Sequence, residues 1–370
     1  MPVSFQYGIE HECALLRSDG RFADFTNTSY AELAAVVDAL PDDAVSPAGL
    51  RTGRLRVDGV AIRRKRWYVE GYERYDDAGV VWRYDVKGLE TRTPTHDDPA
   101  AAVATLAADQ ARLDAAAAAR GLTTTVIGFN PVRSEYAIDP PFSAWERERI
   151  LVTPEDRSDH LHMTTYGPDL NLSWGADADE LVDAARKLTA LSPYLVPLSF
   201  SSPFRDGRPW GGLSARTEVR TGVRPAVLAY VAADVPVPAS DPTLVKRARS
   251  ASEVGRLEFK AFDACPDLTL YAELMALLTG LVLDTTLPER ATTPDTALHR
   301  SAARTGYADP DLRAGARAAL DAAGAAVADR PADAAGLAAL RARFDRDECP
   351  ARDMLAHYAA GHAVAGLRPR

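Results

Sequence analysis

Stretches in which apolar and polar residues alternate, or in which β-branched and aromatic residues gather, predict strands along this chain. The first stretch covers residues 3–17 and ends at a turn over residues 18–20. Residues 57–75 and 80–93 predict a hairpin, with residues 76–79 as its turn. Further strands are predicted over 123–129, 169–174 and 256–263.

Helical spacing of the apolar residues separates these strands. It predicts helices over 30–40, 98–120, 177–191 and 268–282. Gly121 is a natural C-cap for the second of these helices. Residues 136–150 predict no regular element, and residues 203–215, rich in Gly and Pro, predict a loop.

The C-terminal part, from about residue 296 to 370, is predicted to be helical almost throughout, with breaks near Pro310, Pro331 and Pro350. Antiparallel turns mixed with helices, without a regular βαβ rhythm, indicate an α+β fold. We find neither an internal repeat nor a linker that would divide the chain. We therefore expect residues 1–370 to form a single domain with a helical C-terminal part.

The composition of the 370 residues excludes some classes of protein. Apolar residues make up 46% and charged residues 26%, as in folded globular proteins rather than disordered ones. The net charge of −9 argues against general affinity for nucleic acid or for anionic membranes, which both attract basic proteins. We expect neither kind of partner, and the sequence predicts no oligomeric state.

The location expected for the protein follows from its apolar runs and its cysteines. No apolar run approaches the roughly 20 residues that span a bilayer, and the N-terminus lacks the pattern of a signal peptide. The cysteines, Cys13, Cys265 and Cys349, are few and far apart, which suits a reducing compartment. We expect a cytoplasmic protein.

Two carboxylates near the N-terminus are the first candidate for chemistry. Glu10 and Glu12 are two residues apart on a predicted strand, so both point to one face, while Ile9 and Cys13 are apolar. Two such carboxylates repel each other unless a cation lies between them, and Mg²⁺ prefers oxygen ligands. The other interpretation is an acidic pair that faces solvent at a sheet edge.

Three later strands carry polar residues whose role stays open. Glu90 stands alone in its strand, which is usual for an exposed residue. Asp169 and Asn171 share one strand face, which either meets water or lines a site. Glu258 and Lys260 also share a face, where they suit either a metal with its phosphate or a structural ion pair.

A loop rich in Gly, Ser and Arg is the last candidate. Residues 198–217 include Arg205, Arg208 and Arg216, and arginine can clamp a carboxylate or a phosphate. An ordinary surface loop would carry the same residues. His160 and His162 have no third ligand nearby that would make a zinc site. The chain has no phosphate-binding Walker loop, no dinucleotide fingerprint and no serine-hydrolase elbow.

Four segments resemble motifs of the glutamate–cysteine ligases and related carboxylate–amine ligases, both in their residues and in their order along the chain. GIEHE resembles their first acidic strand, and LETRTP their second. LSPYLVPLSFSSPFRDGRPWGGLSAR resembles their long central motif, and LEFKAFD their late strand. The resemblance extends over about residues 8–263, and the central motif is its most specific part.

This resemblance implies a glutamine-synthetase-like fold: a curved antiparallel sheet whose concave face holds ATP and metal, with helices behind it. It implies a ligase that uses ATP and Mg²⁺, with Mn²⁺ as an alternative ion. The reaction expected from the family forms an acyl phosphate on the γ-carboxylate of glutamate, which cysteine then attacks to give γ-glutamylcysteine. A different acid or amine, or a catalytically silent metabolite binder, stays open as an alternative.

The resemblance also assigns expected roles to single residues. The metal ligands would be Glu10, Glu12, Glu90 and Glu258. Arg216 would lie near the acidic substrate or the transferred phosphate, and Lys260 would contact phosphate where the family normally has arginine. Asp169 and Asn171 stand where relatives have His-x-His or His-x-Asn and would contact the nucleotide, although Asp169 replaces a histidine.

Overall fold

The computed structural model describes residues 3–42, 65–152, 154–248 and 251–369. Residues 57–64, which belong to the first arm of the predicted hairpin, lie outside this part of the chain. The strands are β1 (Gln6–Arg17), β2 (Phe22–Ala23), β3 (Trp67–Tyr75), β4 (Val81–Arg92), β5 (Leu122–Thr125), β6 (Pro168–Ser173), β7 (Phe204–Arg205), β8 (Arg208–Pro209), β9 (Val227–Val231), β10 (Val245–Arg247) and β11 (Arg256–Phe259). The helices are α1 (Tyr30–Asp38), α2 (Pro99–Ala118), α3 (Ala144–Val152), α4 (Ala178–Leu195), α5 (Ala215–Arg220), α6 (Thr269–Leu283), α7 (Thr296–Thr305), α8 (Pro310–Ala326), α9 (Pro331–Asp345) and α10 (Pro350–Ala359).

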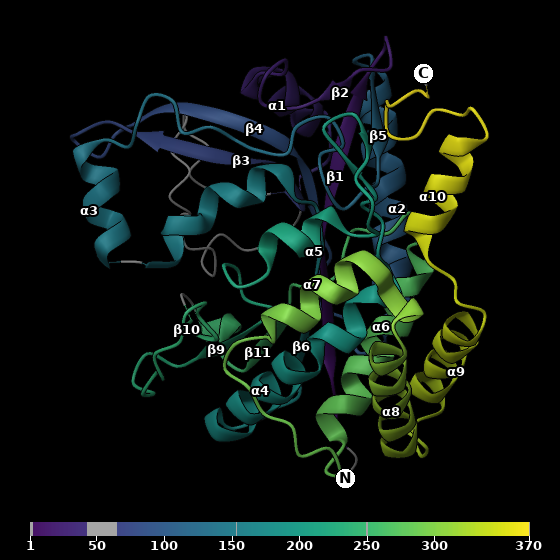
Figure 1. Ribbon diagram of the computed structural model, residues 1–370. Helices are drawn as coiled ribbons and strands as arrows, with labels where there is room; N and C mark the ends of the chain where they lie inside the picture. The colour runs from purple at the N-terminus through teal and green to yellow at the C-terminus, as the bar shows by residue number, and fades with distance from the viewer. Residues whose placement is uncertain (1–2, 43–64, 153, 249–250, 370) are drawn as a thin grey trace.

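One large sheet runs through the protein in the order β10-β9-β11-β6-β1-β4-β3, with β2 and β5 also paired to β1 (Figure 1). Its strands pair antiparallel, as predicted, except that β10 and β9 are parallel. The sheet is therefore mixed at one edge. The sequence analysis missed β9 and β10, whose apolar and proline-rich surroundings have no alternation to mark them.

The central strand β1 shows why the sheet has two different faces. Ile9, His11 and Cys13 are buried on one face, while Glu10 and Glu12 alternate with them on the other. On the apolar face, the His11 ring forms a hydrogen bond with the Tyr271 hydroxyl at 3.1 Å. Burial lowers the pKa of His11 to about 4, so the ring stays neutral among its apolar neighbours.

Helices cover the apolar face of the sheet. α2 contacts β1, α4 contacts β9 and β11, and α6 contacts β6, while α8 and α9 pack on the far side of α6. In Figure 1 α4, α6, α8 and α9 gather in the lower part of the molecule. The residues of α6 are buried almost around the whole helix, as expected for a helix that has a sheet on one side and helices on the other.

One prediction for the middle of the chain was wrong. Residues 136–150 were expected to be irregular, but α3 begins at Ala144 and a 3₁₀ helix follows over Pro154–Thr164. Ser143 and Glu146 supply the signal: the Ser143 hydroxyl accepts from the Glu146 amide, and the Glu146 carboxylate accepts from the Ser143 amide. This capping box starts the helix although two prolines precede it.

The C-terminal helices follow the prediction, with a different role for the prolines. Pro310, Pro331 and Pro350 each occupy the first residue of a helix, where the missing amide hydrogen leaves no bond unmade. The breaks therefore lie just before the prolines. Across residues 3–42, 65–152, 154–248 and 251–369, none of the helices combines the length and the hydropathy that a membrane crossing requires.

We expect Leu277→Ala to lower the free energy of unfolding by about 2–5 kcal/mol, because it leaves a cavity in a rigid core. Leu277 lies in α6 with none of its surface exposed. Leu151→Ala is the matched control, because 82% of Leu151 is exposed. Urea unfolding measures both variants, and equal effects would contradict the central place of α6.

Candidate active site

The polar face of the sheet collects carboxylates from five strands. Glu10 lies opposite Asp169 across the β1–β6 pair, and Glu12 lies opposite Glu90 across the β1–β4 pair. Glu258 lies opposite Asn171 across the β11–β6 pair. Strand register therefore makes neighbours of residues that are far apart in the chain. The sequence predicted neighbours only within a single strand, such as Glu10 and Glu12.

The first set of neighbours is the β6 carboxylate group, made of Glu10, Asp169 and Glu258. One oxygen of each side chain lies within 4.8 Å of the others, as the ligands of one metal ion do. Glu258 is buried, and the other two are half-buried. The resemblance placed Asp169 at the nucleotide, whereas the structure places it among the carboxylates expected to hold metal.

The second set is the β4 carboxylate group, made of Glu12, Glu70 and Glu90, in which one oxygen of each side chain also lies within 4.8 Å of the others. Sequence reasoning missed Glu70 on β3. Its partner across the β3–β4 pair is Gly88, two residues before the expected ligand Glu90 on the same strand. A lone glutamate in a strand carries almost no signal, because only the register of β3 against β4 brings it to this group.

Lys260 links two members of the β6 carboxylate group. Its ammonium donates to Glu258 at 2.6 Å and also to Asp169. Although burial alone would lower the pKa of Lys260, the attraction of Asp169 and Glu258 raises it, so the ammonium stays charged. Lys260 is therefore a fixed positive charge beside these carboxylates.

Arg92 joins the two carboxylate groups, because its guanidinium lies 3.1 Å from both Glu10 and Glu90. Lys87, which is buried, contacts Glu12. Burial raises the pKa of Glu12, but the charge of Lys87 and its hydrogen bond outweigh that effect and lower it. Sequence reasoning singled out neither Lys87 nor Arg92.

The carboxyl groups of Asp169 and Glu258 have opposite pKa shifts. Burial, together with the nearby charges of Glu258 and Glu10, raises the pKa of Asp169 to about 7 in spite of Lys260. Glu258 is buried too, but the positive charges of Lys260 and Arg256 hold its pKa below the usual range. Near neutral pH, Glu258 is therefore ionised, while Asp169 is present in both its protonated and its ionised form.

A buried carboxylate, Asp263, holds the long central motif against the late strand. It accepts hydrogen bonds from the Ser201 amide at 3.1 Å, the Ser202 hydroxyl at 2.6 Å and the Ser214 hydroxyl at 3.0 Å. Ser214 in turn caps the N-terminus of α5. The two segments that share this carboxylate therefore fix the helix that carries Arg216.

Arg216 lies buried beside the late strand, with 3% of its surface exposed. Its guanidinium donates to the carbonyl oxygens of Lys260 and Ala261, both at 2.9 Å. A Cβ atom on Gly167 would lie 2.2 Å from this guanidinium, so only glycine leaves room for it there. The Gly167 amide also donates to Glu12 at 2.7 Å, which places Arg216 close to the β4 carboxylate group.

The donor atoms at this site fit a hard divalent cation. The two carboxylate groups offer oxygen ligands, as Mg²⁺ and Mn²⁺ prefer. The Asn171 side-chain oxygen is a further acceptor that is buried and has no hydrogen-bond donor among the described residues. Its amide nitrogen donates to the Asp169 carbonyl at 3.3 Å, which leaves the oxygen available.

The structure thus brings together the eight residues to which the resemblance assigned roles, whereas Arg205 and Arg208 lie on the separate β7–β8 hairpin. Glu10, Glu12, Glu90, Asp169, Asn171, Glu258, Lys260 and Arg216 all belong to or adjoin the two carboxylate groups. Their individual roles stay predictions. Cys13 is fully buried in the core.

Comparison with known proteins agrees with this geometry. The family model of glutamate–cysteine ligase family 2 matches residues 6–236. Glutamate–cysteine ligase EgtA of Mycolicibacterium smegmatis is 30% identical over 133 residues, which are 35% of this chain and 31% of that ligase. The match thus spans less than a third of the length of this relative.

Solved structures share the fold at low sequence identity. A bifunctional glutathione synthetase from Pasteurella multocida matches with a TM-score of 0.52 and 12% identity, over 99% of this chain and 50% of that one. A glutamate–cysteine ligase from Francisella tularensis in complex with AMP matches with a TM-score of 0.52 and 11% identity, over 96% of this chain and 85% of that one. The ligase PafA in complex with the ubiquitin-like protein Pup matches with a TM-score of 0.53 and 14% identity, over 96% of this chain and 66% of that one. The glutamine-synthetase-like prediction is confirmed: a curled sheet lies against helices.

We expect the protein to bind two Mn²⁺ ions, one at each carboxylate group. Glu258→Gln should weaken one site and Glu70→Gln the other, each by at least the roughly tenfold that loss of an outer partner causes. Electron paramagnetic resonance of free Mn²⁺ counts the bound ions. Glu289→Gln, an exposed change of the same type, should leave both sites intact. If Glu258→Gln and Glu70→Gln weaken the same site, the two-group division is wrong.

In Glu70→Gln the β6 carboxylate group is the metal site expected to stay intact. This site should bind Mn²⁺ more weakly as the pH falls below about 7, the pKa of Asp169. A proton on Asp169 competes with the metal, so the affinity should fall up to about tenfold per pH unit. The same Mn²⁺ titration at several pH values measures this. In Asp169→Asn the pH dependence near 7 should disappear; its persistence would assign the proton to another group.

Proposed function

The chain belongs to glutamate–cysteine ligase family 2, and from this premise we propose that it is an ATP-dependent carboxylate–amine ligase. The observation that carries the proposal is the pairing of two carboxylate groups with Lys260 and Arg216 on one face of the sheet. A protein that only bound a neutral metabolite would gain nothing from so many charges at a site where each must be balanced.

The proposed reaction has two steps. A carboxylate oxygen of the acid substrate forms a bond to the γ-phosphorus of ATP, and ADP leaves. The amine nitrogen then bonds to the acyl carbon, the phosphate leaves, and the nitrogen loses a proton. Bound Mg²⁺ would neutralise the phosphates during the first step. Glu10, Asp169 and Glu258 would hold one ion, and Glu12, Glu70 and Glu90 a second.

The positive side chains serve the charge that moves during these steps. Lys260 stays charged beside Glu258, at the end of β11, where it can contact a phosphate oxygen. Lysine offers a point charge and lacks the bidentate fork of the arginine that relatives carry at this position. Arg216 lies next to Lys260 and would steady the oxyanion that is transferred or attacked.

Glutamate and cysteine are the substrates that we propose, because the family name and the named relatives point to them. A ligase for another acid or amine would need the same metal and phosphate groups, since these act on ATP rather than on the side chain of the amine. PafA, which acts on Pup, is an example of the same fold in another ligase. A silent binder is the weaker candidate, because it has no use for two metal groups.

We expect ADP release that requires Mg²⁺, ATP, glutamate and cysteine together, with a product at the mass of γ-glutamylcysteine. Glu10→Gln should lower turnover by at least about 100-fold, since a charge that stabilises the transition state is lost. Glu289→Gln is the control. A coupled ADP assay and mass spectrometry give the readouts.

Each other outcome has a definite meaning. ADP release with a different acid or amine keeps the ligase proposal and changes the substrates. An active Glu10→Gln variant would remove Glu10 from the metal site. Tight ATP binding without ADP release for any pair of substrates would leave the silent binder as the better interpretation.

A further inference from the structure

Helix α5 carries two buried arginines whose guanidinium groups have few partners. Arg216 and Arg220 are four residues apart, so they lie on one face of the helix. Only 3% and 8% of their surfaces are exposed. Across the described ranges, neither of these arginines forms an ion pair with a carboxylate, and their guanidinium groups donate to backbone carbonyls. We call them the α5 arginine pair.

A buried charge without an opposite charge is costly to the folded state. Arg220 gains little in return, because its contact with the Pro225 carbonyl is long, at 3.3 Å. Burial and the repulsion of Arg216 and Arg224 together lower the pKa of Arg220 well below its ordinary value. The Nε atom of Arg216 is buried with no hydrogen-bond acceptor among the described residues. The pair therefore has unused capacity to bind an anion.

The α5 arginine pair lies at the phosphate end of the proposed site. Arg216 donates to the carbonyl oxygens of Lys260 and Ala261 at the end of β11. Arg220 donates to Pro225, and the carbonyl of the next residue, Ala226, accepts from the Lys260 amide at 2.8 Å. Both arginines thus lie against the segment that carries Lys260, whose ammonium contacts the β6 carboxylate group.

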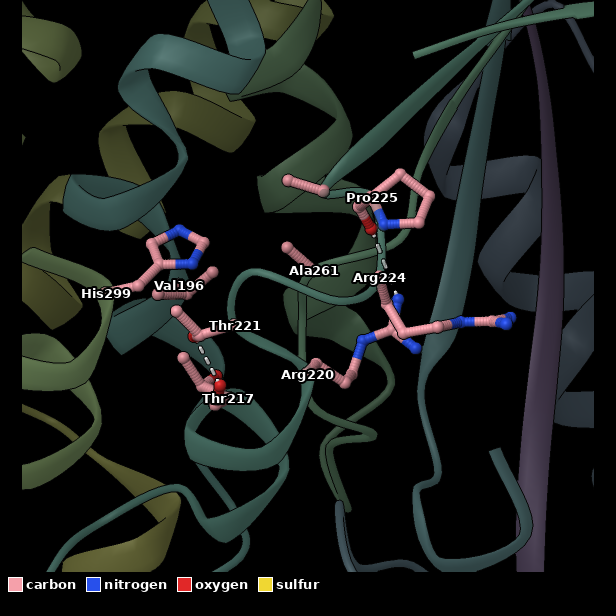
Figure 2. Close-up of a pocket in the computed structure, with 9 residues that line it drawn as sticks. Val196, Thr217, Arg220, Thr221, Arg224, Pro225, Ala261 and His299 are labelled. Carbon is pink, nitrogen blue, oxygen red and sulfur yellow. Dashed lines mark hydrogen bonds between the residues drawn. The ribbon is translucent and has the colours of Figure 1, made fainter. Parts of the chain in front are cut away.

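The small cavity near Arg220 is not where an anion would bind. It has a volume of about 20 Å³, enough for little more than one water. Figure 2 shows the side chains of Arg220 and Arg224 leaving the chain on the side away from His299, another residue of the cavity lining. The Thr221 hydroxyl there already donates to the Thr217 carbonyl at 2.6 Å.

We propose that Arg220, together with Arg216, binds an oxyanion of the ligase reaction at the end of β11. This inference rests on the proposed function and adds a residue that the sequence analysis did not single out. Two sources have the same chemistry: a carboxylate of the acid substrate and the terminal phosphate of ATP. The planar guanidinium forms parallel hydrogen bonds to two oxygens of either one.

A purely structural role for Arg220 makes a different prediction. If its bond to Pro225 held the loop that leads into β9, then removal of the guanidinium would lower the melting temperature. If the charge is instead kept for a ligand, an apolar side chain of similar length should leave the melting temperature unchanged or raise it. The ligand affinity would then fall without loss of folding.

The test compares Arg220→Met with the wild-type protein and with Arg300→Met, which changes an exposed arginine of α7. Calorimetry gives the melting temperature without ligands. Isothermal titration then gives the affinity for ATP, ADP, glutamate and inorganic phosphate, in the presence of Mg²⁺. We expect Arg220→Met to weaken one oxyanion ligand by about 10- to 100-fold, as for a lost charged hydrogen bond, and Arg300→Met to weaken none.

The pattern of losses identifies the source of the oxyanion. Weaker glutamate binding with unchanged ATP and ADP assigns the pair to the substrate carboxylate. Weaker ATP binding with unchanged ADP assigns it to the terminal phosphate. Arg220→Lys, which keeps the charge but loses the fork, should show a smaller loss in the same ligand and remains informative if Arg220→Met fails to fold.

The proposal is overturned if Arg220→Met keeps every affinity, whether or not its melting temperature falls. It is also overturned if the wild-type protein binds none of the four ligands. Failure of the ligase proposal looks different. Phosphate or ATP binding that depends on Arg220, without ADP release for any substrate, would keep the oxyanion site and reject the reaction.

Discussion

Repulsion among the six carboxylates on one face of the sheet is the constraint on which this structure depends. Glu10, Glu12 and their neighbours lie so close that ionising all of them at once would oppose folding. Positive side chains from the same strands reduce this repulsion: Lys260 and Lys87 contact one group each, and Arg92 contacts both groups. The strand register holds these charges together against their repulsion. Packing on the apolar face of the sheet must stabilise that register. Helix α6 and its neighbours provide this packing.

The balance of charge differs along the site. At the two carboxylate groups, acids and bases are paired within ion-pair distance. At the end of β11, by contrast, Arg216 and Arg220 are buried against carbonyl oxygens, and among the described residues neither forms an ion pair with a carboxylate. A site with two carboxylate groups at one side and guanidinium groups without an ion-pair partner at the other suits a substrate with phosphate between them. This polarity links the fold to the proposed ligase chemistry.

Asp263 shows how distant segments build one site. The serines of the central motif are separated from Asp263 by about 50 to 60 residues, and each finds the same carboxylate. Burial raises the pKa of Asp263, while these donors and Arg216 favour its charged form. This carboxylate adds three hydrogen bonds to the contacts that hold the loop ending at Ser214 against the late strand, and through Ser214 it helps to fix the position of α5. The two motifs act as one structural unit.

The sequence by itself determined the alternation of β1, the long helices and the acidic residues that share a strand face, because these depend on local period and on neighbours two residues apart. It also carried the family resemblance that pointed to Glu258 and Arg216. The tertiary structure alone decided that Glu70 joins Glu12, that Asp169 joins Glu10, and that Arg220 lacks a carboxylate in the described part of the chain. Those facts depend on register between strands and on what lies next to a side chain after folding. Spacing along the chain contains neither, because partners separated by a hundred residues leave no local pattern.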